Sequence, residues 1–514
     1  MIEKLKKCNL LNIIFFIALF ILCFALSTKD SALDFDFFSR LIMGSHVIKT
    51  GHPAFVDIVS YTPTHIWYDH EWLLSGLFFL IAAKFSGFGL VIFKTLICFL
   101  SIVFLHLNIS IINENKNYPY KYIYLILSTL LLLSLSFFDR LRCQDAGNIF
   151  YLIFILILEI TRKNYNSKLI YSTPLLMLLW LNCHGGSVFM FGILLVYALG
   201  EALNGKKFLK YLLIIIPNAL VYLINPWGME FVKFMIDAVL YTDRGWVGEW
   251  QSPFDKRVGF LGKYIFILAL TGGLYCYNLI KNKIKLKNID YTKLLVLFIT
   301  LIPALTYIKF RTQFVLTAII FLYPEFKQLT DDITSRIKFR IPVGIIAILA
   351  SVIYSTYIFC NYSPKNNWYL HLKQEMPLTC LQFLIDNNIK GNVFAPFNFG
   401  GFIAYKNYPD LMIYIDGRHE QVYDYEILLK HMYFLNMTTY DAPNVFMEYP
   451  TDIIIMQDFW ACNMFLNNQS YFKKVFQHSG FSVYLAPRVQ RFSYTYPIEA
   501  KDYTIDKIFK SRFN

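Results

Sequence analysis

Long apolar runs separated by short polar segments occupy the first 361 residues of the chain. A helix of about 20 apolar residues crosses the hydrocarbon core of a bilayer, so these runs predict membrane-spanning helices. Eleven spans are predicted: 10–27, 88–112, 121–138, 147–161, 168–183, 186–203, 209–224, 261–280, 292–307, 312–325 and 341–361. A shorter apolar segment, residues 72–85, predicts a helix at the membrane surface rather than a twelfth span.

The pattern changes after the last span. Residues 362–490 alternate short apolar runs with helical patterns, which indicates a small α/β domain. Strands are expected in NVFAPF, LMIYIDG, TDIIIMQ and FSVYLAP, and helices in LQFLIDNN and near residues 424–436. The sequence therefore predicts a polytopic α-helical membrane domain over residues 1–361, an α/β domain over 362–490 and a polar tail over 491–514.

Composition and charge agree with this division. Of the 514 residues, 56% are hydrophobic and only 16% are charged, whereas about a quarter are charged in a soluble domain. The net charge of +13 lies mostly in short segments between spans, which argues against a nucleic-acid partner. With the N-terminus in the cytoplasm, the inner segments hold twenty Lys and Arg and the outer ones eleven. This bias obeys the positive-inside rule and places the C-terminal domain outside the membrane.

The loop after the first span, residues 28–71, is long and acidic. It carries Arg40 together with the carboxylates Asp34, Asp36, Asp57, Asp69 and Glu71. Long loops tend to be functional, and carboxylates at a bilayer are costly unless they bind something. The predicted topology also puts the other polar motifs on the outer side: 139–145, 182–186, 225–228, 248–253 and 309–311. We therefore expect the ionisable residues of the membrane domain to gather at one face.

The acidic loop has a further pattern, Asp36-Phe37-Phe38-Ser39-Arg40 followed by Gly51 and Asp57. This pattern resembles the first external loop of GT-C superfamily glycosyltransferases, especially the oligosaccharyltransferase and protein mannosyltransferase branches. The resemblance implies an inverting enzyme that takes a sugar or glycan from a polyprenyl-(pyro)phosphate carrier. The acceptor would be a lipid, a polysaccharide or a protein on the outer face of the membrane.

Such a transfer requires a base on one side of the anomeric carbon and positive charge on the departing phosphate. Asp36 is the first candidate for the base or for a metal ligand, and Asp34 is the second. Residues two apart on an extended loop face the same side, so the two carboxylates could share a cation. The alternative is that both carboxylates only cap the helix that follows them.

Cationic residues of the outer loops are candidates for binding the carrier phosphate, since guanidinium groups suit bidentate phosphate recognition. The candidates for substrate and phosphate binding are Arg40, Arg142, His184, Lys309 and Arg311, with Glu249 on the acceptor side or as a metal ligand. The arginines could instead reach out to lipid headgroups, and His184 could be a structural residue. Both alternatives stay open at the level of the sequence.

The resemblance also implies a divalent cation, Mg²⁺ or Mn²⁺, held by the first loop, the second external loop and a later glutamate. The corresponding residues are Asp36, Asp145 and Glu249, with Asp139 as an alternative in the second loop. The chain lacks the close acidic pair that oligosaccharyltransferases carry in that second loop.

Two motifs of the C-terminal domain resemble the strand-and-loop pattern of soluble domains on related enzymes. They are Phe397-Asn398-Phe399-Gly400-Gly401-Phe402 and Ile415-Asp416-Gly417-Arg418. The resemblance puts Asp416 and Arg418 on the acceptor side, but the Trp-Trp-Asp core for reading a peptide is missing. The alternatives are tight turns at Gly400-Gly401 and Asp416-Gly417, and an ion pair between Asp416 and Arg418.

Two other functions remain open: a transporter or flippase of a lipid-linked or anionic solute, and a non-catalytic scaffold. Transporters often show repeated halves with charged residues near mid-membrane, which this sequence does not suggest. A nucleotide-binding loop, HExxH and GxSxG are absent from the sequence, which argues against ATP-driven transport and serine hydrolysis. The composition, rich in Lys, Asn and Ile, indicates an AT-rich bacterial genome and hence a bacterial cytoplasmic (inner) membrane.

Overall fold

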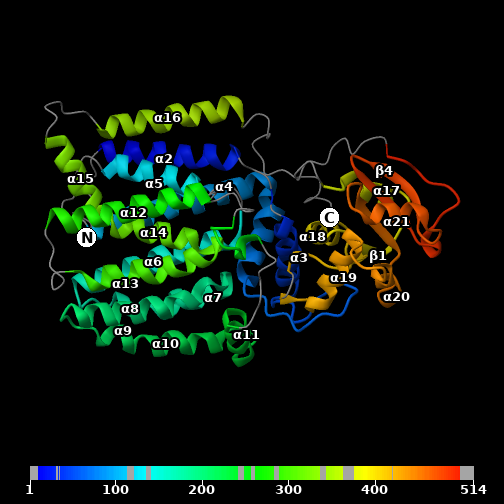
Figure 1. The fold of residues 1–514 in the computed structure, drawn as a ribbon, viewed down its shortest axis with the longest axis horizontal. Coiled ribbons are helices and arrows are strands. Elements are labelled where there is room, and N and C mark those ends of the chain that lie inside the picture. The colour runs from blue at the N-terminus through cyan, green and yellow to red at the C-terminus, as the bar shows by residue number, and fades with distance from the viewer. Residues whose placement is uncertain are drawn as a thin grey trace. The chain divides into compact units, whose positions relative to one another are not determined.

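The computed structural model forms two compact units (Figure 1). It describes residues 10–29, 33, 35–112, 121–134, 141–240, 248–255, 261–282, 289–335, 343–362, 376–418 and 421–497. The helical unit comprises residues 1–30 and 91–368, and the α/β unit comprises residues 31–90 and 369–514. The long acidic loop, which the sequence analysis placed in the membrane domain, therefore folds together with the C-terminal domain.

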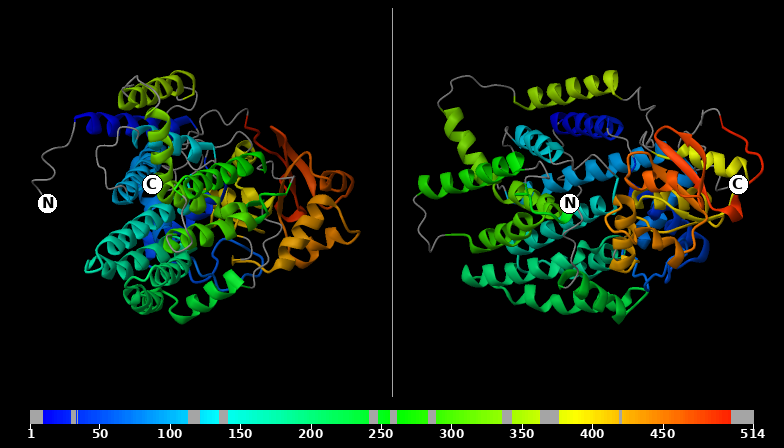
Figure 2. Two further views of the ribbon diagram at one scale, coloured as in Figure 1. Left: turned by 60° about the vertical axis from the view of Figure 1, so that its left-hand side comes forward. Right: turned by 45° about the vertical axis from the view of Figure 1, so that its right-hand side comes forward.

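Apolar helices that run alongside one another form the helical unit; α2 lies beside α16 and α8 beside α13 (Figures 1 and 2). Its elements are α2 (Leu10–Lys29), α5 (Lys121–Ser134), α6 (Cys143–Lys163), η1 (Leu169–Ser172), α7 (Thr173–Cys183), η2 (Gly185–Val188), α8 (Phe189–Leu203), α9 (Leu209–Leu213), α10 (Ile215–Leu220), η3 (Val221–Ile224), α11 (Met229–Leu240), η4 (Gly248–Trp250), α12 (Leu261–Lys281), α13 (Tyr291–Thr306), η7 (Ile308–Phe310), α14 (Arg311–Phe321), α15 (Tyr323–Ser335) and α16 (Val343–Asn361). Each predicted span overlaps one or more of these helices or α4 (Trp72–Ile112).

Six helices of the described residues are long and apolar enough to cross a membrane. They become seven if the pair 209–224 and 229–238, bent by 108°, counts as one broken span. The segments 169–183 and 291–306 are apolar but shorter. The number of eleven spans therefore stays a prediction.

Helix α4 is interrupted at Ser86, whose φ of 58° and ψ of −156° are not helical. A positive φ is uncommon for a residue with a side chain, so the break is a specific feature of the backbone. It separates residues 72–85, predicted to form their own short helix, from the apolar run that starts near residue 88. The boundary between the two units also falls here, after Leu90.

The α/β unit contains a five-stranded sheet in the order β2-β1-β3-β5-β4. Strands β2, β1 and β3 are parallel, whereas β5 is antiparallel to both β3 and β4. Its elements are α3 (Phe35–Thr50), α17 (Leu378–Asp386), β1 (Gly391–Phe394), α18 (Phe397–Asn407), β2 (Leu411–Ile413), α19 (Tyr425–Asn436), η9 (Ala442–Asn444), α20 (Val445–Glu448), β3 (Ile453–Gln457), α21 (Cys462–Asn468), β4 (Lys473–His478), β5 (Phe481–Leu485) and η10 (Pro487–Val489).

The four predicted strands correspond to β1, β2, β3 and β5, and the two predicted helices to α17 and α19. Strand β4 was not predicted, because its sequence KKVFQH is polar and it forms an edge of the sheet. The tight turn considered for Gly400-Gly401 is wrong, since both glycines lie inside helix α18.

The acidic loop is part of the core of the α/β unit. Helix α3 packs against α18, where the ring of Phe38 lies 4.9 Å from that of Phe402 between centroids. After α3 the chain runs along the outer edge of strand β2. The backbone N–H of Ile413 donates to the carbonyl of Val59 at 2.9 Å, and the backbone N–H of Tyr61 donates to the carbonyl of Ile413 at 3.0 Å. The loop thus extends the sheet by a short segment.

Candidate functional site

Asp36 lies in the first turn of α3, the helix that opens the acidic loop. A carboxylate is favourable there, because it faces the positive end of the helix dipole. The neighbouring Phe37, Phe38 and Ser39 are buried, whereas the side chain of Asp36 is exposed. Asp34, the second candidate base, lies outside the described residues. Asp36 is therefore a carboxylate presented at the surface by a helix whose other side is packed.

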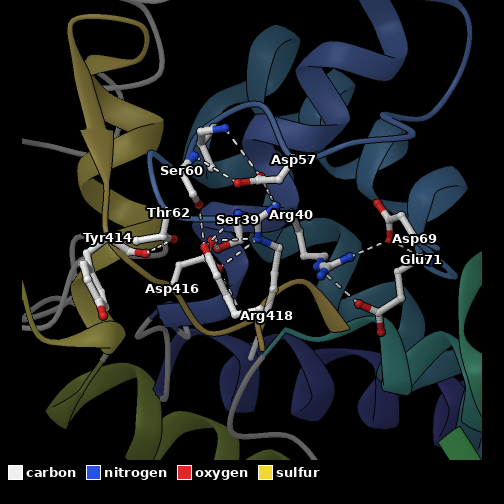
Figure 3. Close-up of polar contacts among 12 residues, drawn as sticks. Ser39, Arg40, Asp57, Ser60, Thr62, Asp69, Glu71, Tyr414, Asp416 and Arg418 are labelled. Carbon is white, nitrogen blue, oxygen red and sulfur yellow. Dashed lines mark hydrogen bonds and ion pairs between the residues drawn. The ribbon is translucent and has the colours of Figure 1, made fainter. Parts of the chain in front are cut away.

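Arg40, a predicted phosphate ligand, is engaged inside the loop. Its guanidinium forms ion pairs with Asp69 at 2.7 Å and Glu71 at 3.3 Å (Figure 3). It also lies 5.4 Å from the ring centre of Trp67. Its side chain is only 10% exposed. These contacts join α3 to the end of the acidic loop. Gly51 follows the last residue of α3 and has a φ of 79°, a conformation in which residues with a side chain are strained.

A second arginine, Arg418, binds two carboxylates at the centre of the unit (Figure 3). Its Nη1 lies 2.6 Å from Asp57 of the acidic loop, and its Nε lies 2.9 Å from both oxygens of Asp416. Asp416 also accepts a 2.9 Å hydrogen bond from Ser39. The ion pair between Asp416 and Arg418, considered as an alternative from the sequence, is therefore present.

Asp416 and Arg418 are charged although both are buried. Burial works against the charge of Asp416, but Arg418 outweighs it and lowers the pKa of Asp416 below its usual value. Burial likewise opposes the charge of Arg418, but Asp416 and Asp57 raise its pKa well above the usual range. A contact between either side chain and an acceptor would need that side chain to become exposed first. The buried cluster of Ser39, Asp57, Asp416 and Arg418 therefore joins the acidic loop to the rest of the α/β unit.

In the helical unit, the predicted glutamate lies between two of the predicted cations. Oε2 of Glu249 lies 2.9 Å from Arg142, and Oε1 lies 2.9 Å from Lys309. The Lys309 ammonium also lies 4.8 Å from the ring centre of Trp250. Burial alone would raise the pKa of Glu249, but Lys309 and Arg142 outweigh it and lower the pKa to about 2.

The predicted cationic residues Arg142 and Arg311 lie where two helices begin. Helix α6 starts directly after Arg142, and α14 starts at Arg311. Gln144 of α6 donates to the carbonyl of Lys309 at 3.4 Å, which holds the two helix starts together. Free N–H groups and the helix dipole make such N-termini favourable for anions.

His184, another predicted phosphate ligand, ends helix α7 beside the start of α6. Its Nδ1 accepts a 3.0 Å hydrogen bond from the backbone N–H of Gly186. Its ring packs on Gly147 of α6, where a Cβ atom would lie 3.1 Å from Nδ1. The structure thus brings Arg142, His184, Lys309 and Arg311 to one end of the helical unit, and we name these four residues the cation cluster.

The fold has known counterparts. No protein-family model and no curated protein sequence matches the chain. A solved structure that matches is the archaeal oligosaccharyltransferase AglB from Archaeoglobus fulgidus, in complex with an inhibitory peptide and a dolichol-phosphate. Its TM-score is 0.58 at 10% identity, over 88% of this chain and 70% of that one. The chain shares its fold with an archaeal oligosaccharyltransferase. The resemblance to GT-C glycosyltransferases drawn from the sequence is therefore confirmed at the level of the fold.

A second Archaeoglobus fulgidus oligosaccharyltransferase structure, a complex with Zn and sulfate, matches with a TM-score of 0.54 at 11% identity. It covers 86% of this chain and 67% of that one. The zinc and sulfate are properties of that structure. Since so few residues are shared with either protein, the roles of residues here rest on the geometry of this chain.

Two of the predicted metal ligands, Asp145 and Glu249, accept hydrogen bonds from other groups of the chain. Asp145 caps α6 by accepting a 2.9 Å hydrogen bond from the backbone N–H of Arg142. Each oxygen of Glu249 accepts from a different cationic side chain. Across the part of the chain that the structure describes, no group of three or more His, Cys, Asp or Glu is placed to hold a metal. Asp145 and Glu249 therefore already have partners, and a divalent cation held by Asp36, Asp145 and Glu249 stays a prediction.

A second ionic cluster lies at the other end of α6, where the sequence analysis expected none. Arg162 lies 2.7 Å from Glu201 of α8 and 3.8 Å from Glu159, and it also pairs with Asp290 ahead of α13. Both glutamates are almost fully buried. The expectation that ionisable residues gather at one face is therefore wrong. Glu159 and Glu201 lie inside predicted spans, and a charged residue inside a membrane span needs a partner. These two glutamates could therefore have indicated the second cluster from the sequence.

Proposed function

We propose that this protein is a membrane glycosyltransferase. It moves a sugar or a preassembled glycan from a polyprenyl-(pyro)phosphate carrier to an acceptor on the outer face of the membrane. The observation that carries the proposal is the cation cluster at the starts of α6 and α14, in a chain with the AglB fold. Cationic side chains near helix N-termini suit a phosphate, and the AglB complex contains a dolichol-phosphate.

In the proposed reaction the acceptor attacks the anomeric carbon from the side opposite the phosphate, so the configuration inverts. The new bond joins the acceptor atom to the anomeric carbon. The bond from that carbon to the phosphate oxygen breaks, and its electron pair leaves with the phosphate. Arg142, Lys309 and Arg311 offset the charge that develops there, with His184 as a further donor.

Asp36 is the proposed base that takes the proton of the attacking acceptor group. It is exposed, and it lies in the first turn of helix α3. No step is assigned to a metal, because Asp145 and Glu249 accept hydrogen bonds from other groups of the chain.

The proposal places the α/β unit outside a bacterial cytoplasmic membrane and assigns eleven spans to the helical part. A lipid, a polysaccharide or a protein remains as acceptor, and the peptide in the AglB complex supports a protein among these.

The test is intact glycan analysis by mass spectrometry of surface lipids, polysaccharide and secreted proteins. Cells without the gene are compared with cells that carry the wild type, Asp36→Asn or Asp410→Asn. Asp410 is the matched control, because it lies in the same unit but is half exposed and pairs with the exposed Lys390. We expect one glycan to disappear without the gene and to return with the wild type and Asp410→Asn only.

Full restoration by Asp36→Asn would show that Asp36 is not the base. If no glycan changes in any strain, the protein is not a glycosyltransferase of these acceptors, and a transporter or scaffold becomes the better interpretation.

A further inference from the structure

The two glycine-containing motifs of the α/β unit lie against the helix that carries Asp36. A Cβ atom at Gly401 of α18 would lie 2.3 Å from the hydroxyl oxygen of Ser39. A Cβ atom at Gly417, just after β2, would lie 2.1 Å from Oδ1 of Asp36 and 3.2 Å from its Cγ. The backbone conformation at neither position requires glycine, so space alone explains these two glycines.

The segment that contains Gly417 is held in place on both sides. Asp416 accepts the hydrogen bond from Ser39, three residues after Asp36, and Arg418 binds Asp57 of the same loop. Gly417 therefore cannot move away from α3 without breaking buried polar contacts. A methyl group at Gly417 would therefore have to displace the carboxylate of Asp36, which can turn about two side-chain bonds.

We infer that Gly417 is a positioning residue that sets the direction of the Asp36 carboxylate. The backbone at Gly417 fills the space on one side of the carboxylate, so the carboxylate is confined to the orientations that remain. This inference rests on the proposed function, in which Asp36 is the base. Because misplacing a catalytic group by about 1 Å can lower a rate about 100-fold, the absence of one methyl group is significant here.

The inference gives the motif Ile415-Asp416-Gly417-Arg418 one function. Asp416 and Arg418 attach the motif to the acidic loop, and Gly417 lies where the attached segment meets the base. The motif then acts on the reaction through Asp36 instead of by contact with an acceptor.

The test is Gly417→Ala, with the rate of transfer measured in membrane vesicles that contain equal amounts of folded protein. The acceptor is the one identified by the glycan analysis. We expect kcat to fall at least 10-fold while the KM for the acceptor changes less than twofold, because the base moves but the acceptor site does not. Gly272→Ala in α12 is the control, since no atom lies within 4 Å of its added methyl group, and it should leave kcat unchanged.

The contact itself is tested without an activity assay. Gly417→Ala should lower the melting temperature of protein that has Asp36 and leave it unchanged in the Asp36→Ala background, where no carboxylate meets the methyl group. An equal effect in both backgrounds would overturn the inference.

The activity results separate the inference from the proposed function. If Asp36→Asn is inactive while Gly417→Ala retains the wild-type kcat, Asp36 is the base but Gly417 does not position it. If Asp36→Asn is fully active, the proposed base and the inference both fail.

Discussion

The hydroxyl of Ser39 donates a 2.9 Å hydrogen bond to Asp416, a residue 377 positions further along the chain. Both side chains are buried. Ser39 is close in sequence to the candidate base, and Asp416 is close in sequence to the glycine that lies against it. Ser39 follows Asp36 by three positions, and Asp416 precedes Gly417. This one bond therefore connects the helix that carries the base with the segment that confines it.

Loss of the Asp416 charge should destabilise the α/β unit. Asp416→Asn removes one of the two carboxylates that neutralise the buried Arg418, and breaking such a pair costs about 3–5 kcal/mol. Ser39→Ala removes one hydrogen bond and should cost about 1 kcal/mol. Thermal unfolding of the purified protein in detergent measures both changes.

The control is Asp410→Asn, because its pair with Lys390 is half exposed and such pairs contribute about 0–1 kcal/mol. Equal melting temperatures for Asp416→Asn and Asp410→Asn would contradict the structural importance of the buried cluster.

Charge removal from the cation cluster should weaken binding of the lipid-linked donor. Arg142→Gln and Lys309→Gln each remove a charged hydrogen-bond donor, which is worth about 1.5–3 kcal/mol, or about 10- to 100-fold in kcat/KM for the donor. Initial rates at varied donor concentration provide the measurement. Lys233→Gln is the matched control, since its pair with Glu230 is exposed on α11. A donor dependence identical in all three variants would exclude the cluster as the phosphate site.

Acid should weaken the contacts of Glu249. The folded pKa of about 2 lies below the ordinary value of 4.5, so the ionised form is the one that folding favours. The stabilisation is then complete above about pH 4.5 and is lost as the pH falls from 4.5 to about 2. Melting temperatures of wild type and Glu249→Gln should differ at neutral pH and converge over this range. A difference that does not depend on pH would refute the assignment.

The buried cluster around Arg162 should be essential for the helical unit. Arg162→Met leaves Glu159, Glu201 and Asp290 without their shared cation, at a cost of about 3–5 kcal/mol. The yield of folded protein and its melting temperature should both fall. Lys327→Met is the control, because Lys327 pairs with the partly exposed Asp331 on α15. Neutralising Glu201 and Asp290 in the Arg162→Met protein should restore part of the loss.

Much of the fold follows from local sequence patterns. Apolar runs produce helices in the helical unit, and short apolar runs produce β1, β2, β3 and β5, because burial of these segments dominates their choice of structure. The sequence analysis did not predict strand β4 or helix α18, and the reasons differ. β4 is polar because it is an edge strand. In α18, the backbone of Ile415 approaches Gly400 closely, and Ser39 of α3 approaches Gly401.

The candidate site was predictable only in part. Charged residues end the predicted spans, so the sequence could place Arg142, Lys309 and Arg311 at helix ends. It could not show which charges pair across long separations, since the partners of Asp57 and Ser39 lie more than 360 positions away. Arg40, Asp416 and Arg418 were therefore assigned to substrates, whereas the structure pairs them with other residues of the protein.

The division of the α/β unit between two distant stretches of the chain has a consequence for biosynthesis. Residues 31–90 are translated before residues 91–368 of the helical unit, and residues 369–514 after them. At about 5–20 residues per second, roughly 15–60 s pass before Val59, Trp67 and their neighbours meet the strand and arginine that cover them. An unfinished chain that already contains every predicted span still lacks all five strands of the sheet, and Asp36 then has neither Gly417 nor the bond between Ser39 and Asp416 beside it. The α/β unit can therefore form only after the last part of the chain has been made.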